Sequence, residues 1–368
     1  MDEDSEGFLY PKVDASLCID CKLCEKVCPV INQNETRKPI AVYAAKNPNE
    51  EIRMKSSSGG IFSMLAESTI NQGGVVFGAR FNEKWEVVHD YTETVEGIIP
   101  FRGSKYVQSQ IGDSYIKAQN FLKEGREVLF SGTPCQIAGL NKFLSKEYDN
   151  LLTVDVVCHG VPSPLVWRDY LDHLYKTGKI SAQSRKDTLP IGSISFRDKR
   201  TGWKNFSFVI KDKGGKITVQ ETLHKNIFMQ GFLNNLYLRP SCYACPSKAG
   251  KSQSDITIAD FWGIQNYYPE FDDDKGTGLI LINTQKASQT LSDLSIESIK
   301  TSYNQALPGN PTIEHSVTIP KLRDLFCKQY SKLGIVAINQ ICQNMRPKLH
   351  QRVISVSKLL IKKLIRKK

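Results

Sequence analysis

Two short apolar segments flank an amphipathic one near the middle of the chain, and this pattern constrains the fold most. REVLFSG (126–132) and LLTVDVVCHG (151–160) are typical of buried strands, and QIAGLNKFLSKEY (136–148) is typical of a helix. A strand–helix–strand unit places its strands parallel through a right-handed crossover. Because ligands collect beyond the carboxyl ends of such strands, Cys135 and Cys158, which follow the two strands, are predicted to share one site.

The surrounding segments predict a mixed α/β protein. SSSGGIFSMLAESTINQGG indicates a loop, a helix and a glycine stop, and GVVFGARF with WEVVHDYT indicates a hairpin. SISFRDKRTGWKNFSFVIKDKGGKITVQ is typical of an antiparallel meander of three strands. HKNIFMQGFLNNLYLRP indicates a helix, SDITIADFWG starts another strand, and TGLILINT is expected to close the core.

We therefore expect an α/β fold whose mixed sheet contains the β-α-β unit and the meander, with a small ferredoxin-like head and a helical C-terminal tail. The head spans residues 1–35 and the core spans 40–286. Within the core, about 40–115 form an N-terminal part and 116–286 a C-terminal part. The basic tail spans 287–368.

The head carries the motif CIDCKLCEKVCPV at 18–30, in which Cys18, Cys21, Cys24 and Cys28 follow the spacing C-x2-C-x2-C-x3-C-P. This spacing is typical of bacterial ferredoxins with two 4Fe–4S clusters, in which the fourth cysteine binds the other cluster. The chain shows one such run. Either Cys28 folds back to complete a single cluster, or the head binds iron poorly.

A second cysteine set is predicted in the core. Cys242 and Cys245 form a C-x2-C pair in SCYACPSK and would join Cys135 and Cys158. Four thiolates suit a 4Fe–4S cluster or tetrahedral zinc, and the iron–sulfur reading is favoured by the head motif. Each of Cys135 and Cys158 taken alone could instead be a buried core thiol. His159 either tunes the cluster by a hydrogen bond or is an ordinary packing residue.

Composition narrows the class of protein. Ten cysteines without a secretory signal favour metal chemistry over disulfides, and the absence of a long apolar run excludes a spanning helix. Cys327 and Cys342 are expected to be small buried side chains. Of the 49 Lys and Arg, 13 lie in residues 321–368 beside one acidic residue, Asp324, so the body is near neutral and no nucleic-acid surface is expected.

The end of the chain forms a predicted basic amphipathic helix, and two readings stay open for it. Residues 347–368 could contact an anionic membrane or a partner, or could pack their apolar side on the core. We expect a cytoplasmic protein, peripheral on the inner face of the membrane under the first reading. The apolar positions are Leu349, Val353, Val356, Leu360, Ile361 and Leu364.

KSSSGGIF, at the start of the first core helix, is a second candidate site. Serines and glycines at a helix N-terminus leave N–H and hydroxyl groups free to face an anion such as phosphate. The other reading is a plain helix cap with a flexible approach. A Rossmann dinucleotide site is not indicated, because no G-x-G-x-x-G follows a strand.

Taken in order, seven motifs resemble the coenzyme F420 hydrogenase/dehydrogenase beta-subunit family over about residues 55–283. They are SSSGGIFS, FRGSKYVQS, SGTPCQIAGL, VCHGVPSP, SFRDKRTGW, SCYACP and DITIADFWGI. Ala259 departs slightly from the family, where glycine is expected. The head resembles the ferredoxin-type extension of many bacterial members but begins inside the linker that usually follows a first cysteine run, so we expect a truncated head.

The resemblance implies FAD, a core 4Fe–4S cluster and electron transfer between a two-electron carrier and one-electron centres. It makes Cys135, Cys158, Cys242 and Cys245 the core cluster ligands. It also implies two groups of residues near FAD. Ser57, Ser58, Gly59 and Gly60 are candidates for its pyrophosphate, and Lys105, Tyr106, Gly132 and Thr133 are candidates for the flavin neighbourhood.

The function expected from the sequence is an iron–sulfur flavoprotein oxidoreductase whose partner is a redox protein or a small hydride donor. Two alternatives stay open. One is a zinc-stabilised binding or assembly protein that kept the fold without the redox chemistry. The other is a reductase of a sugar or other metabolite, of the kind encoded near surface-polysaccharide genes, that does not use the deazaflavin.

Overall fold

The computed structural model describes residues 1–180 and 190–345. An eight-stranded mixed sheet forms its centre, in the order β13-β3-β12-β11-β7-β6-β4-β5. Strands β4, β6, β7 and β11 run parallel to one another, and the remaining pairings are antiparallel. The strands are β3 (Ala41–Lys46), β4 (Val75–Phe81), β5 (Val87–Thr92), β6 (Val128–Gly132), β7 (Leu151–Val156), β11 (Ile256–Asp260), β12 (Gly278–Ile282) and β13 (Glu297–Thr301).

The predicted β-α-β unit is confirmed. Strands β6 and β7 are parallel neighbours, with Gly132 opposite Asp155, and α5 (Pro134–Leu144) connects them. Helix α5 begins sharply because Thr133 and Gln136 form a capping box and Pro134 occupies the first helical position. The carboxyl ends of the two strands therefore lie side by side, as the sequence indicated.

Helices cover both faces of the sheet, because successive strand residues point to opposite sides. In β6, Val128 and Phe130 pack with α4 (Ser114–Lys123) and α5, whereas Leu129 packs on the opposite face with α3 (Ile61–Asn71) and α8 (Gln285–Ser292). A further cluster beside β3 and β12 includes Ala306 of α9 (Tyr303–Ala306). Helix α2 (Glu50–Lys55) leads into the loop before α3.

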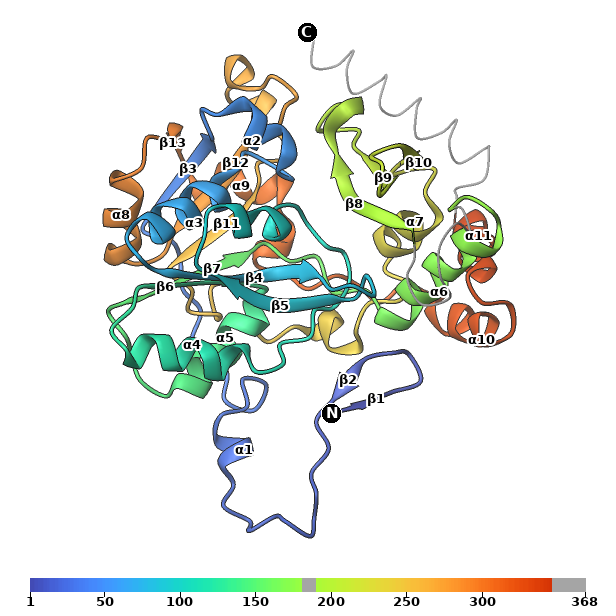
Figure 1. Cartoon of the computed structure of the whole chain (residues 1–368), viewed down its shortest axis with the longest axis horizontal. Helices are drawn as coiled ribbons and strands as arrows, with labels where there is room; N and C mark the ends of the chain where they lie inside the picture. The colour runs from blue at the N-terminus through green and yellow to red at the C-terminus, as the bar shows by residue number, and fades with distance from the viewer. Residues whose placement is uncertain (181–189, 346–368) are drawn as a thin grey trace, which may run out of the picture.

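A second layer, confirmed as a meander, stands beside the large sheet (Figure 1). It consists of β8 (Ile191–Asp198), β9 (Ser207–Asp212) and β10 (Ile217–Thr222). An aromatic core that includes Trp167, Phe196 and Phe228 joins this sheet to helices α6, α7, α10 and α11. The helices are α6 (Pro164–Lys176), α7 (Ile227–Leu233), α10 (Arg323–Leu333) and α11 (Val336–Met345).

Two segments differ from the expectation. The sheet does not end at TGLILINT, because β13 adds an edge strand antiparallel to β3. The helix predicted over HKNIFMQGFLNNLYLRP is shorter, since α7 ends at Leu233 and Asn235 adopts a positive φ of 60°. The predicted basic helix at 347–368 lies outside the described residues.

The head docks on the meander layer through its first residues. Strands β1 (Asp2–Glu3) and β2 (Leu9–Tyr10) form a small hairpin whose Phe8 is fully buried. Gly7 has φ 86° and lies so close to Leu165 of α6 that a side chain would not fit. Helix α1 (Leu23–Lys26) follows in the extended loop at the bottom of Figure 1. Within 1–180 and 190–345, we find no helix that combines the length and apolarity needed to cross a bilayer.

Candidate functional site

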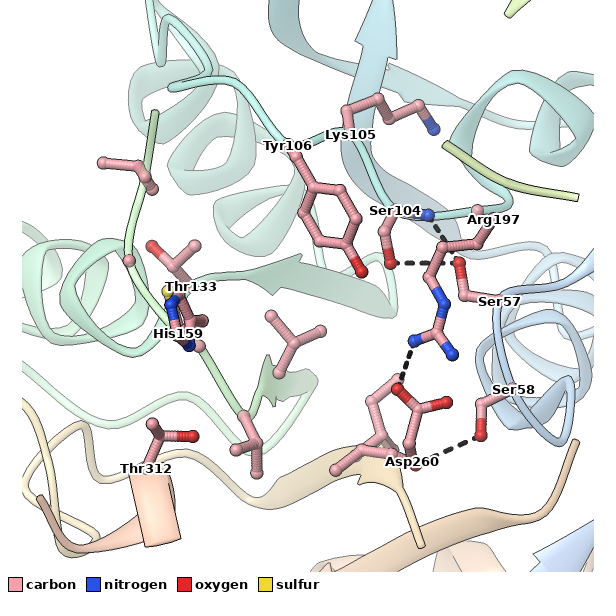
Figure 2. Close-up of a pocket in the computed structure, with 18 of the residues that line it drawn as sticks. Ser57, Ser58, Ser104, Lys105, Tyr106, Thr133, His159, Arg197, Asp260 and Thr312 are labelled. Atoms are coloured by element: carbon pink, nitrogen blue, oxygen red, sulfur yellow. Dashed lines mark hydrogen bonds and ion pairs between the residues drawn. The ribbon is translucent and has the colours of Figure 1, made fainter. Parts of the chain in front are cut away.

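A cavity of about 830 Å³ opens where the carboxyl ends of β6, β7 and β11 meet the meander layer. Its lining includes the loop before α3, the segment 102–107, and residues of β8 and α7. This is the position at which open α/β sheets bind ligands, and the volume falls within the range of small-molecule and cofactor sites. Figure 2 shows Tyr106, Thr133, Arg197 and Asp260 arranged around it.

The serine-rich loop forms one wall of this cavity. Ser57, Ser58, Gly59 and Gly60 all line it, directly before α3. The Ser57 hydroxyl oxygen accepts the N–H of Ser104 at 2.7 Å, and the Ser58 hydroxyl donates to the carbonyl of Thr277 at 2.9 Å. No side chain caps α3, so its N-terminus faces the cavity without an internal anion.

Two glycines allow the loop to pack against the sheet. A Cβ on Gly59 would lie 2.3 Å from the carbonyl oxygen of Ala45 and 2.6 Å from the nitrogen of Gly278. Gly60 has φ 82°, a left-handed conformation that glycine adopts without strain. The loop therefore lies directly on β3 and β12, and its glycines are required by backbone contact.

Lys199 fixes the same loop through hydrogen bonds to backbone carbonyls. Its Nζ donates to the carbonyl oxygens of Arg53, Ser58 and Lys275, at 2.8, 2.6 and 2.7 Å. The residue is 4% exposed. Burial lowers the pKa of Lys199 to about 7, with the charges of Arg197 and Arg53 acting in the same direction. Lys199 thus ties the meander layer to the loop.

A buried ion pair links the two layers inside the cavity. Arg197 from β8 donates through Nη1 to Asp260 at the end of β11, and the Trp203 indole N–H donates to the same carboxylate at 2.8 Å. The guanidinium lies over the rings of Phe206 and Trp262, at 4.5 and 5.2 Å from the centroids. Sequence reasoning missed this pair, although both residues lie in motifs that carried the family resemblance.

The two predicted residues of the segment 102–107 differ in orientation. Lys105 lines the cavity, but its Nζ donates to the carbonyls of Pro100 and Arg102 at 2.6 and 3.0 Å. Burial lowers the pKa of Lys105 to about 7. Tyr106 instead directs its hydroxyl into the cavity, and its ring stacks on Phe232 at 4.6 Å (Figure 2). Burial raises the Tyr106 pKa, against the lowering effect of the Arg197 charge.

Gly132 and Thr133, which the family resemblance made candidates for the flavin neighbourhood, line the cavity at the end of β6. Thr133 donates its N–H to the side chain of Gln136 at 2.9 Å, and Gln136 donates to Ser109 at 2.8 Å. Ser109 in turn contacts His89 at 3.0 Å. Burial lowers the pKa of His89 to about 4, so this cavity residue is neutral near pH 7.

The four core cysteines gather behind the cavity wall. Cys158 lines the cavity, and Cys135 follows Thr133, whose hydroxyl lies 3.2 Å from its sulfur. Cys242 accepts the N–H of Val161 at 3.4 Å. Every pair among Cys135, Cys158, Cys242 and Cys245 interacts electrostatically. Burial is the main cause that raises the pKa of Cys135, of Cys158 and, to about 11, of Cys242.

The thiols are near neighbours but do not form a closed metal cage. Among the described residues, no group of three or more His, Cys, Asp or Glu side chains is placed so that it could hold a metal ion. The donor set nevertheless fits a thiolate-bound centre in its chemistry, because neighbouring thiols that repel as anions are stabilised by a cation between them. Cys135 is exposed and the other three are partly covered, so all four sulfurs lie near the surface. Ligation by these four residues stays a prediction.

His159 and the remaining cysteines differ in how far they are buried. His159 lines the cavity and contacts Asn235 at 2.6 Å, and burial lowers its pKa. Cys342 is buried and Cys327 is half-buried. In the head, Cys18, Cys21 and Cys24 are exposed and Cys28 is partly covered, so the structure leaves their ligation untested.

Comparison with known families matches most of the chain to two models of one family, the beta subunit of coenzyme F420 hydrogenase/dehydrogenase. The model for the N-terminal part of that protein matches residues 42–114, and the model for its C-terminal part matches residues 125–302. The second match ends just after β13. A 4Fe-4S binding domain model matches residues 11–30, around the head cysteines.

Among solved structures, the chain is similar to one from the F420-reducing NiFe hydrogenase complex of Methanosarcina barkeri. The two are 17% identical, with a TM-score of 0.48, over 83% of this chain and 92% of the other. A search of curated proteins returned no match.

Proposed function

The chain belongs to the coenzyme F420 hydrogenase/dehydrogenase beta-subunit family, and from this premise we propose that it is a flavin-dependent iron–sulfur oxidoreductase. In this proposal FAD occupies the cavity and the core cysteines hold a 4Fe–4S cluster. Electrons pass between a two-electron donor or acceptor and one-electron centres.

One observation carries the proposal: Cys158 belongs both to the cavity wall and to the group of four interacting thiols. A cofactor in the cavity would therefore lie next to a centre bound by these cysteines. Such proximity is what electron transfer between the two requires. A purely structural metal site has no need of a cavity on one side.

The residues present fit a flavin nucleotide. The loop of Ser57, Ser58, Gly59 and Gly60 offers an uncapped helix N-terminus to a pyrophosphate. Tyr106, Gly132 and Thr133 would border the ring system, and Lys105 would stand at the edge with its amine held by carbonyls. When bound, a flavin supplies the conversion between hydride and single-electron transfer, and the protein supplies position and charge.

The physiological partners are proposed by class. On the two-electron side we propose a deazaflavin coenzyme or another metabolite, and on the one-electron side a redox protein reached through the head or the core cluster. The 4Fe-4S model match at residues 11–30 supports an iron–sulfur role for the head.

Anaerobic purification tests the proposal. We expect a brown-yellow protein that contains iron and acid-labile sulfide, releases flavin on denaturation, and bleaches at the flavin band with a suitable donor. A colourless protein that contains about one zinc per chain would instead support the assembly-protein alternative. A flavoprotein that a metabolite reduces, but a deazaflavin does not, would support the metabolite reductase.

A further inference from the structure

Lys248 is a buried cation that follows the C-x2-C pair of the core in the chain. It comes three residues after Cys245, and the residue is 8% exposed. Its Nζ donates to the carbonyl oxygen of Cys158 and, at 2.8 Å, to that of Thr312. Lys248 therefore bonds to the backbone of one core cysteine and follows another closely in sequence.

The charge of Lys248 has no carboxylate partner. Its Nζ contacts carbonyl oxygens, and no Asp or Glu oxygen of the described residues lies within 4.0 Å of it. Lys199, which carbonyls also hold, has the charges of Asp260 and Asp273 nearby. The groups of opposite charge that interact with Lys248 are two of the core thiols when ionised, Cys158 and Cys242. Because a buried charge requires a partner, a thiolate-bound centre is the counter-charge that this position needs.

Backbone contacts fix the loop that carries Lys248. Arg37 donates its backbone N–H to the carbonyl of Ala249 at 3.0 Å, and Ala249 donates its own N–H to the carbonyl of Ile313 at 2.8 Å. A Cβ on Gly250 would lie 2.3 Å from the carbonyl oxygen of Arg37, so the chain at Arg37 packs directly on this loop. Because the ammonium is already held in place, little reorganisation is needed when the charge of the thiol group changes.

Lys248 lies behind the wall of the large cavity. Cys158 and Thr312 belong to the described lining of that cavity, and Lys248 does not. Lys248 lines instead a second, small cavity of about 30 Å³, again together with Cys158 and Thr312. A molecule in the large cavity would therefore approach Cys158 from one side, with the ammonium on the other. This position suits an effect on the thiol group and not a direct contact with the occupant of the large cavity.

We propose that Lys248 raises the reduction potential of the centre held by the core thiols, as a fixed cation that is not itself a ligand. One-electron reduction adds one negative charge to that centre. A cation held nearby therefore stabilises the reduced state more than the oxidised state. This inference rests on the proposed function, because it requires a redox-active cluster on the core cysteines.

Lys248→Met tests the effect of the charge. Anaerobically purified protein is poised at a series of potentials, and the reduced cluster is measured by electron paramagnetic resonance. The core signal is the one that Cys158→Ser removes, which separates it from any cluster in the head. At a given potential, we expect the ratio of reduced to oxidised core centre to fall about tenfold in Lys248→Met, a shift of about 59 mV for a one-electron couple.

Two further variants separate the charge from other effects of the substitution. Lys251→Met is the matched control, because it removes the same side chain from the same loop, where the amine contacts the side chain of Gln33 at 3.1 Å. Its core potential should equal that of wild type. Lys248→Gln covers the case in which Lys248→Met fails to fold, since glutamine keeps an N–H donor for the carbonyls and removes only the charge. It should lower the potential in the same direction.

The outcomes distinguish this inference from the proposed function. Equal core potentials in wild type and both Lys248 variants, or an equal shift in Lys251→Met, overturn the role of Lys248 and leave the iron–sulfur proposal intact. Loss of the core signal from both Lys248 variants, in protein that still unfolds cooperatively, shows a structural role and also overturns it. Wild type without a core cluster signal defeats the cluster part of the proposed function, and this inference with it.

Discussion

Arg197 and Asp260 form a buried ion pair that joins the meander to the large sheet, with side chains 5% and 14% exposed. Residues from two separate sheets thus meet at one cavity wall. Removal of either residue would leave the other charged, buried and without its ion-pair partner. The pair therefore affects both the stability of the fold and the charge of the cavity wall.

Asp260→Asn should therefore lower the free energy of unfolding substantially. It removes the charge partner of a buried arginine, a change that typically costs about 3–5 kcal/mol. Urea unfolding followed by circular dichroism measures it. Asp198→Asn is the control, since its pair with Arg200 is more exposed and should cost about 1 kcal/mol or less. Similar losses in the two variants would contradict a special role for the Arg197–Asp260 pair.

Lys199 makes the free energy of unfolding depend on pH, and its buried environment determines the direction of that dependence. Because burial lowers its pKa to about 7, the folded protein loses this proton above pH 7 while the unfolded chain keeps it to about pH 10.4. The unfolded state binds more protons in that window, so the Lys199 contribution makes stability rise with pH. The slope has an upper bound of about 1.4 kcal/mol per pH unit.

Lys199→Met isolates that contribution. The variant is less stable at every pH, because three carbonyls lose their donor, and the gap to wild type should widen between pH 7 and 10. Lys105, whose pKa is also about 7, is common to both proteins and cancels in the comparison. Lys213→Met, at an exposed turn, should leave the slope unchanged. A gap that stays constant with pH means that Lys199 remains charged throughout.

Gly59→Ala should displace the serine loop from the sheet. The added carbon would meet backbone atoms of Ala45 and Gly278, which cannot rotate away, so we expect the upper end of the 1–3 kcal/mol range for overpacking, about 3 kcal/mol. Thermal unfolding and pyrophosphate binding measure the two effects. Gly214→Ala, where only the flexible Asp212 carboxylate is near, should change stability by about 0.5 kcal/mol or less. If Gly59→Ala unfolded at the same temperature as wild type and bound pyrophosphate equally well, the close backbone packing would be contradicted.

The sequence predicted the parts of the site that depend on local pattern. Apolar runs and an amphipathic segment predicted β6, α5 and β7, and hence that Cys135 and Cys158 follow two neighbouring parallel strands. The serines and glycines that precede the helix likewise predicted the serine loop before α3. Sequence patterns predict these features because residues close together in the chain determine them.

The parts that were missed depend on contacts distant in sequence. Arg197 reads as one polar residue in an alternating strand, and only the packing of the meander against β11 gives it Asp260 as a partner, 63 residues away. Strand β13, with the sequence ESIKT, is a short polar edge strand that has no hydrophobic signature and forms only because β3 offers a free edge. The early end of α7 follows from Asn235 at positive φ, which the local helical pattern did not reveal.

Cys158→Ser tests the core centre most directly, because this residue joins the cavity to the other three thiols. If the four cysteines hold a cluster, the variant should lose up to about four irons and the matching sulfide per chain, while any iron bound by the head stays. Elemental analysis of anaerobically purified protein measures this. Cys327→Ser is the control, since Cys327 lies outside the group of four and contacts Arg323. Unchanged iron in Cys158→Ser would remove this cysteine from the ligand set, and equal loss in both variants would show that the iron responds to general damage. Flavin content adds a further readout, because the thiol lines the cavity: loss of iron with flavin retained would show that the cavity folds and binds without the cluster.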